Sequence, residues 1–248
     1  MTDASARPPK TSPERPRILV TRAEPGAAAT AAKLAAGGLD PIIEPLLLLQ
    51  PLPVAAVPEF DALAFTSPNG VRLFSQLSPR RDMPVYCVGK RTSEVARKCG
   101  YQIALSANGD VQALARVIAR RLAPDARLLH AGNAESRGDL AARLREAGRR
   151  AEFLATYAAE PAATPGPMLA RHLAGEAVFD AVLIHSPRAA MILAGFLETA
   201  PRHAIVSVAA ISAAAADPLV PHARNLEIAT HPNEDALILA LESLFRRA

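Results

Sequence analysis

Short apolar runs alternate along the chain with segments of helical spacing. Six of these runs predict β-strands, at residues 17–20, 62–65, 85–88, 127–131, 181–185 and 204–209. Helical periodicity follows each strand, and the clearest helices are expected at about residues 26–36, 92–99, 137–147 and 234–246. The alternation of strand and helix is typical of parallel α/β units.

The same pattern occurs twice. Three pairs of segments align, residues 17–38 with 127–148 at an offset of 110, 60–70 with 179–189 at 119, and 85–96 with 205–216 at 120. The second pair, FDALAFTSPNG with FDAVLIHSPRA, is the strongest, because composition does not dictate a Ser-Pro pair directly after a strand. We therefore expect two similar parallel-sheet α/β domains that arose by internal duplication.

Two extended stretches, residues 42–51 and 152–161, are longer than ordinary loops, and both end in proline. We expect them to form a pair of connectors between the two domains. A ligand is then expected in the cleft between those domains.

Composition narrows the class of protein. Hydrophobic residues make up 50% of the chain and aromatic residues only 4%, which suits helices packed on a parallel sheet. The net charge of +4 fits an anionic ligand or an ordinary charged surface. Nucleic acid is not expected as a partner, because no basic stripe is interleaved with aromatic residues.

The remaining composition argues against export and membranes. Residues 1–15 are rich in Pro, Ser, Thr and charge and contain no apolar core, so we expect a disordered tail and no signal peptide. The apolar run at residues 46–49 is too short to span a bilayer, and a cytoplasmic protein is expected. Cys87 and Cys99 form neither a metal-binding pattern nor a disulfide framework.

In open α/β sheets, ligands bind beyond the carboxyl ends of the strands. Here those ends carry hydroxyls, an amide and arginines, namely Arg22, Thr66, Ser67, Asn69, Thr92, Ser93, Ser136, Ser186, Arg188 and Ser212. Paired carboxylates, a metal-ligand cluster, a Ser-His-Asp set and a glycine-rich phosphate loop are not found among them, so neither a cofactor nor a metal is expected. Helix N-termini beside these residues would attract carboxylates or phosphates. The pattern favours a site that holds a polyanion.

Each candidate also has a structural interpretation. The serines at 67, 93, 186 and 212 and Thr92 can be helix N-caps, with Pro after two of them at the first helical position. Arg22 and Arg188 can form surface ion pairs, and His185 can be a packed core histidine. Tyr157, in the second connector, is either a proton donor facing the cleft or a packed residue with a hydrogen-bonded hydroxyl.

Taken in order, the segments ILVTRAEPG, FDALAFTSPNGV, VYCVGKRTSEVARKCGY, GNAESRGDLAARLREAGRRAEFLATYAAEP and FDAVLIHSPRAA resemble uroporphyrinogen-III synthase, from about Arg17 to the C-terminus. The resemblance implies two α/β domains joined by a two-stranded β connector, with the active site in the cleft. It implies one discontinuous domain of residues 16–50 plus 163–248 and an inserted domain of residues 53–160, in a monomer.

The resemblance also implies a reaction. The substrate would be hydroxymethylbilane, a linear tetrapyrrole with eight carboxylates. Loss of the ring A hydroxyl would give an azafulvene cation. Attack by ring D would form a spiro intermediate that recloses as uroporphyrinogen III, with ring D inverted and water lost. The main task of such an enzyme is positioning, because unassisted closure gives the uninverted isomer.

The resemblance assigns roles to individual residues. Tyr157 aligns with the tyrosine usually proposed as general acid, and Thr66, Ser67, Thr92, Ser186 and Ser212 would line the cleft. Two departures stand out: VSVAAISAAAA keeps only Ser212 where the family usually has a glycine and paired threonines, and Asn69 stands where an arginine is common.

Two other functions are considered. A non-catalytic two-domain protein that binds an anionic small molecule would share this architecture. A two-cysteine racemase would need one nucleophilic cysteine in each half, whereas Cys87 and Cys99 lie in the same half.

Overall fold

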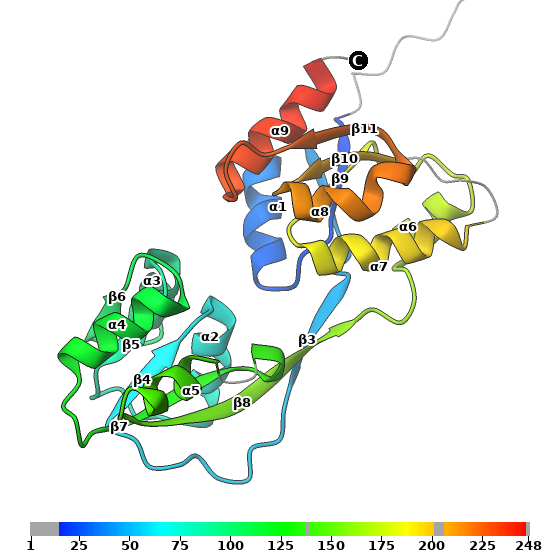
Figure 1. Ribbon diagram of the computed structural model, residues 1–248. Coiled ribbons are helices and arrows are strands. Elements are labelled where there is room, and N and C mark those ends of the chain that lie inside the picture. Colours follow the sequence, from blue (N-terminus) through cyan, green and yellow to red (C-terminus); the bar gives the residue numbers. More distant parts are fainter. Residues whose placement is uncertain (1–14, 137–138, 201–205, 247–248) are drawn as a thin grey trace, which may run out of the picture. The chain divides into compact units, whose positions relative to one another are not determined.

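The computed structural model describes residues 15–136, 139–200 and 206–246. Nearly all of the expected N-terminal tail, residues 1–14, therefore lies outside the described residues. The chain divides into two compact units (Figure 1). Unit 1 contains the residues up to Leu48 and those from Pro161 onward, and unit 2 contains Leu49–Glu160.

Unit 1 is built on a parallel sheet with the strand order β11-β10-β9-β1-β2. Its strands are β1 (Arg17–Val20), β2 (Asp40–Ile43), β9 (Ala181–Ile184), β10 (Val206–Ala210) and β11 (Ala223–Ile228). One face packs against α1 (Gly26–Ala36) and α9 (Glu234–Arg246). The other face packs against α6 (Pro167–Leu173), α7 (Pro187–Glu198), α8 (Ala213–Ala216) and the 3₁₀ segment η2 (Asp217–His222).

Unit 2 is built on a sheet with the strand order β3-β8-β7-β4-β5-β6. Its strands are β3 (Leu47–Pro51), β4 (Ala62–Phe65), β5 (Val85–Cys87), β6 (Ala104–Ser106), β7 (Arg127–Asn133) and β8 (Arg150–Pro161). One face packs against α2 (Pro68–Leu77) and α3 (Lys90–Lys98). The other packs against α4 (Val111–Arg121) and α5 (Asp139–Glu146), the latter preceded by the 3₁₀ turn η1 (Ala134–Ser136).

The central strands are apolar on both sides because both faces of each sheet are covered. On β4, Ala62 and Ala64 face α4 and α5, whereas Leu63 and Phe65 face α2 and α3. All four of these side chains are fully buried. This explains why the sequence shows the strand as one continuous apolar run.

β3 and β8 are neighbours in the sheet, and each contains a point at which the chain passes from one unit to the other (Figure 1). The Ala162 N–H donates to the Leu46 carbonyl, and the Leu52 N–H donates to the Thr156 carbonyl. As the residue number rises along one segment, its partner's number falls along the other. The two segments therefore run antiparallel, and they lie within the two extended stretches expected as connectors, residues 42–51 and 152–161.

The duplication is visible in the strand order. In unit 1 the order β2-β1-β9-β10-β11 corresponds to β8-β7-β4-β5-β6 in unit 2. The registers agree as well: Leu19 pairs with Val182, and their counterparts at offsets of 110 and 119, Leu129 and Leu63, pair with each other. The predicted α/β duplication is confirmed, with the two halves of the pattern connected in opposite order in the two units.

The third expected alignment is wrong by three residues. Val182 pairs with Val208, and its counterpart Leu63 pairs with Val85, so β10 corresponds to β5 at an offset of 123, not 120. Alanine-rich sequence at 209–216 matches several registers equally well, whereas backbone pairing admits one. Ser212 therefore corresponds to Gly89 and not to Thr92.

Candidate functional site

A set of polar side chains gathers in unit 2 at the carboxyl end of β4 and along the neighbouring parts of β7 and β8. We call Thr66, Ser67, His130, Thr156 and Tyr157 the polar cluster. Ser67 is the N-cap of α2, and its Oγ accepts a hydrogen bond from the Gly70 N–H at 3.0 Å. Pro68 follows at the first helical position, where its missing N–H is not required because the first N–H groups of a helix have no intrahelical partner. The N-cap interpretation of Ser67 is confirmed.

Tyr157 reaches this N-cap from β8. Its hydroxyl lies 2.9 Å from Ser67 Oγ, and either oxygen can be the donor. The side chain is 4% exposed. Burial raises the pKa of Tyr157, and the hydrogen bond with Ser67 only partly opposes this rise. The phenol is therefore protonated at neutral pH and can act as a donor.

Tyr157 owes its place to an irregularity between β7 and β8. Ala155 pairs with Gly132, but Tyr157 pairs with the very next residue of β7, Asn133, so one extra residue is accommodated on β8. That residue is Thr156, which is buried and donates its hydroxyl to the Gly132 carbonyl at 3.3 Å. Such bulges re-aim the side chains that follow them.

His130 is, with Thr156, one of the two members of the polar cluster that the sequence interpretation missed. It lies on β7, is 1% exposed, and its Nε2 is 3.3 Å from Thr66 Oγ1. Burial lowers the pKa of His130 to about 4, although the Asp139 charge acts in the opposite direction. A single histidine inside the apolar run RLLHA was the available signal, because a buried strand rarely carries a polar side chain without a partner.

The remaining unit 2 candidates make local hydrogen bonds. Asn69 Oδ1 accepts from Arg72 at 3.4 Å, and Ser136 Oγ donates to the Asn133 carbonyl at 2.8 Å. Each of these bonds spans three residues of the chain, so neither joins distant parts of unit 2.

The expected capping role of Thr92 and Ser93 is wrong. Helix α3 begins at Lys90, with Gly89 as its N-cap and without a side-chain capping bond. Thr92 and Ser93 are buried inside the first turn, and Ser93 Oγ donates back to the Lys90 carbonyl at 2.8 Å. The sequence favoured the later start because the side chains of Thr and Ser can cap a helix, whereas Gly has no side chain to do so.

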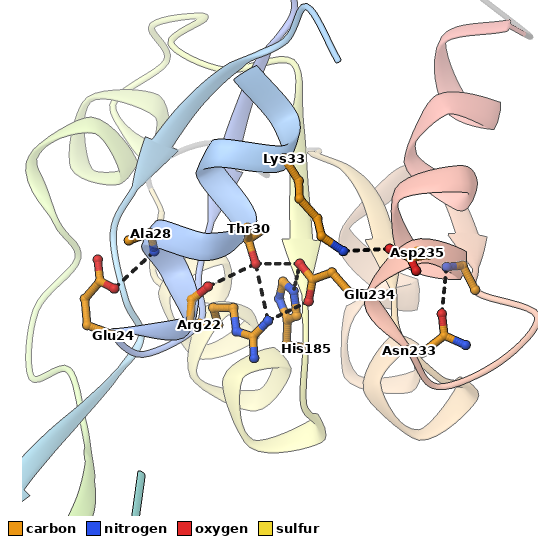
Figure 2. A network of polar contacts seen from close by, with 11 residues as sticks. Arg22, Glu24, Ala28, Thr30, Lys33, His185, Asn233, Glu234 and Asp235 are labelled. Atoms are coloured by element: carbon orange, nitrogen blue, oxygen red, sulfur yellow. Dashed lines mark hydrogen bonds and ion pairs between the residues drawn. The ribbon is translucent and has the colours of Figure 1, made fainter. Parts of the chain in front are cut away.

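In unit 1 the corresponding edge holds a network of charged side chains centred on Glu234, the first residue of α9 (Figure 2). Arg22 Nη1 lies 2.6 Å from Glu234 Oε2. The Thr30 hydroxyl, from α1, donates to the other carboxylate oxygen, which also lies 3.5 Å from His185 Nε2. One carboxylate thus joins the ends of β1 and β9 to two helices.

The network fixes the charge state of Glu234. Burial raises the pKa of this carboxyl, but the hydrogen bond from Thr30 and the nearby His185 ring together outweigh burial. With the nearby positive charge of Arg22 they lower the pKa to about 2. Arg22 also packs on Gly26, where an added Cβ would lie 2.6 Å from Arg22 Nε. The ion-pair interpretation of Arg22 is therefore confirmed.

The other unit 1 candidates are helix starts. Ser186 Oγ accepts from the Ala189 N–H at 3.2 Å, and Ser212 Oγ accepts from the Ala215 N–H at 3.3 Å. Both serines are N-caps, as expected. Arg188 lies in the first turn of α7 and is half-buried.

Ser67→Ala is expected to lower the free energy of unfolding of unit 2 by about 1–2 kcal/mol, because it removes an N-cap and the Tyr157 partner. All three tyrosines, at 86, 101 and 157, belong to unit 2, so urea unfolding followed by tyrosine fluorescence reports this unit. Ser186→Ala removes the matching cap of unit 1 and serves as control. An equal shift of the tyrosine transition in both variants would contradict the assignment.

The two cysteines limit the nucleophilic chemistry. Cys87 is fully buried, and burial raises the pKa of its thiol to about 12, so it is not a thiolate nucleophile at neutral pH. Both cysteines lie in unit 2, which disfavours the racemase.

Within residues 15–136, 139–200 and 206–246, no group of three His, Cys, Asp or Glu side chains could hold a metal ion. A helix long and apolar enough to cross a membrane is likewise not found among the described residues.

Comparison with known proteins identifies the family. The model of the family described as "Uroporphyrinogen-III synthase HemD" matches residues 28–238. The solved uroporphyrinogen-III synthetase of Helicobacter pylori is 18% identical, with a TM-score of 0.60 over 93% of this chain and 99% of that one. A mutant uroporphyrinogen III synthase of the extremely thermophilic bacterium Thermus thermophilus is 16% identical, with a TM-score of 0.51 over 94% and 99%.

The two structural likenesses confirm the predicted two-domain α/β fold. No curated protein matches the chain in a sequence comparison. The family match extends over most of the sequence and includes residues of both units, from α1 to α9. The chain belongs to the uroporphyrinogen-III synthase family.

Proposed function

We propose that the protein converts hydroxymethylbilane into uroporphyrinogen III, closing the ring with inversion of ring D and loss of water. The observation that carries this proposal is the family match over residues 28–238. A carbon–oxygen bond breaks by elimination, without hydrolysis or redox change, so the enzyme is a lyase. Its substrate, with eight carboxylates, suits sheet edges that carry hydroxyls and arginines.

Tyr157 acts as the general acid for the departing hydroxyl. As the carbon–oxygen bond breaks, the bonding electron pair stays on oxygen, which takes the phenol proton and leaves as water. The hydrogen bonds around Tyr157 support this role. The Gly70 N–H donates to Ser67 Oγ, and the Ser67 hydroxyl can in turn donate to the Tyr157 oxygen.

This chain of donors has two effects. It leaves the Tyr157 proton as the one directed at the substrate, since the phenol oxygen is already an acceptor. It also stabilises the phenolate that forms when the proton is transferred, because hydrogen bonds to the charged form lower the pKa of the acid. Gly70 lies at the N-terminus of α2, where the helix dipole favours negative charge.

Four of the other candidates bind substrate carboxylates. The hydroxyls of Thr66, Ser186 and Ser212 and the guanidinium of Arg188 supply donors at the helix starts of the two units. Arg22 is engaged with Glu234, so its part is to hold the loop after β1 in place.

The domain bounds and the monomeric state implied by the resemblance remain predictions. Limited proteolysis tests the domain bounds, and light scattering tests the monomeric state.

The decisive experiment supplies hydroxymethylbilane and separates type I from type III product. Protein is expected to yield the type III isomer, while heat-denatured protein yields type I. Accumulation of type I alone with folded protein present would refute the proposal. A non-catalytic binding protein would instead retain hydroxymethylbilane in a calorimetric titration without changing the isomer formed.

A further inference from the structure

A buried histidine of unit 2 lies beside a hydroxyl that the proposed function uses. His130 pairs with Ala64 of β4, and Thr66 follows Ala64 by two positions. Side chains two residues apart on a strand point to the same face, so His130 and Thr66 meet on the side covered by α4 and α5. The Nε2–Oγ1 distance of 3.3 Å joins them directly.

Among the residues that the structure describes, only one nitrogen of this imidazole has a hydrogen-bond partner. Nδ1 is buried and makes no hydrogen bond. Burial lowers the pKa of His130 to about 4, so at neutral pH the ring is uncharged and carries a single N–H. A proton on Nδ1 would be a buried donor without an acceptor, which is rare in proteins and costly. A proton on Nε2 faces the Thr66 oxygen and leaves only a lone pair unused.

We infer that His130 is a positioning residue that acts through Thr66: its Nε2–H donates to the Thr66 oxygen, so that the Thr66 hydroxyl proton is presented to a substrate carboxylate. The inference rests on the proposed function, which supplies the carboxylate. A free threonine hydroxyl can rotate and donate in several directions. With the imidazole N–H on its oxygen, the hydroxyl turns its proton away from the ring. Hydrogen bonds from such a donor to a carboxylate are among the stronger ones.

The surroundings hold the imidazole in place. The ring lies 5.1 Å from the Phe153 ring, centroid to centroid. Gly132 leaves room beside it: an added Cβ would lie 3.4 Å from His130 Nε2 and 3.8 Å from Ser136 Oγ. A Cβ at position 132 would therefore lie in van der Waals contact with the nitrogen that faces Thr66. A neutral, packed ring fixes a hydroxyl without adding a charge that would compete for the substrate.

His130→Leu is expected to lower kcat/KM for hydroxymethylbilane by about tenfold, the factor that corresponds to one hydrogen bond, chiefly through KM. The free energy of unfolding of unit 2 should stay unchanged or increase, because the buried, unpartnered Nδ1 is removed. His130→Gln, whose amide N–H can replace Nε2–H, should retain most of the activity. Thr66→Val should match His130→Leu, and the double variant should lose no more than Thr66→Val alone.

A matched control exists in unit 1. His172 also has a buried Nδ1 without a hydrogen bond, and its ring stacks on Phe179 at 3.9 Å. His172→Leu makes the same chemical change in the other unit and should leave kcat/KM unchanged. Failure of the proposed function would appear in the wild type, which would make no type III product. The inference would fail if the wild type were active but His130→Leu kept the wild-type kcat/KM. It would also fail if the double variant lost the product of the two single losses in kcat/KM.

The tautomer can be tested without any activity. Side-chain ¹⁵N NMR of the wild type, with His130 assigned from the signals missing in His130→Gln, should show the proton on Nε2 at pH 7. The imidazole of His130 should remain neutral when the pH is lowered well below 6. An Nδ1–H tautomer, or a ring that titrates near pH 6.5, would overturn the inference.

Discussion

Tyr157→Phe is expected to lower kcat by a hundredfold or more, with little change in stability. General acids at their reacting group contribute about 10²–10⁴ in rate, and water would be the remaining donor. The ring of phenylalanine fills the same buried space, so the variant loses only the hydrogen bond with Ser67, worth about 1 kcal/mol. Single-turnover kinetics with hydroxymethylbilane, together with tyrosine-monitored urea unfolding, would measure both quantities.

Tyr101→Phe is the matched control. Tyr101 is a fully buried tyrosine of the same unit, and its hydroxyl accepts from Ser75 at 3.4 Å. Its removal should leave kcat unchanged. If Tyr157→Phe turned over at the wild-type rate, or lost no more than Tyr101→Phe, Tyr157 would not be the acid. Because burial raises the pKa of Tyr157, the phenol should stay protonated into alkaline pH. Deprotonation of Tyr157 should therefore cause no fall in kcat between pH 6 and 9.

Glu234→Gln is expected to destabilise unit 1 by about 3 kcal/mol at pH 7. The pKa of Glu234 is about 2 in the folded protein against 4.5 ordinarily, and each unit of difference corresponds to about 1.4 kcal/mol. Between these two values the unfolded chain binds the extra proton. The stabilisation is therefore complete above about pH 4.5 and is lost as pH falls toward 2.

The difference in the free energy of unfolding of unit 1 between wild type and Glu234→Gln should thus shrink as pH falls from about 4.5 and vanish near pH 2. Urea unfolding followed by circular dichroism reports both units, and the phase without a tyrosine signal belongs to unit 1. Asp235→Asn is the control, because Asp235 pairs with Lys33 in an exposed ion pair worth under about 1 kcal/mol. A difference that persists at pH 2 would show that Glu234 acts by packing and not by charge.

The regular elements could be predicted wherever the local pattern was sufficient. Strand 17–20 and helices 26–36 and 234–246 agree with the structure to the residue, because apolar runs, glycine stops and acidic helix starts are local signals. The start of α3 was displaced by two residues, because Gly89 has no side chain that could mark a cap. Short strands such as β6 and β11, only partly buried, carried too weak a pattern to be recognised.

The contacts of the candidate site could not be predicted, because they depend on residues far apart in the sequence. Arg22 and Glu234 are 212 positions apart, and Thr66 and His130 are 64 apart. The sequence indicated that Arg22 lies at a strand end, but its partner depends on which strands are neighbours. Ser67 and Tyr157, both named from the sequence, are joined by a bond across the sheet that only the strand order β8-β7-β4 explains.

The opposite connection order of the two units has a consequence for biosynthesis. Unit 2 comes from one uninterrupted stretch, so its sheet can assemble as soon as residue 160 has left the ribosome. In unit 1, β1 is a central strand that lies between β2 and β9, and β9 is translated about 160 residues later. At about 5–20 residues per second, the backbone N–H and C=O groups on one edge of β1 wait roughly 8 to 30 s for their neighbouring strand. The inserted unit is thus folded before its host, and the nascent N-terminal segment is the part of the chain that chaperones would shield.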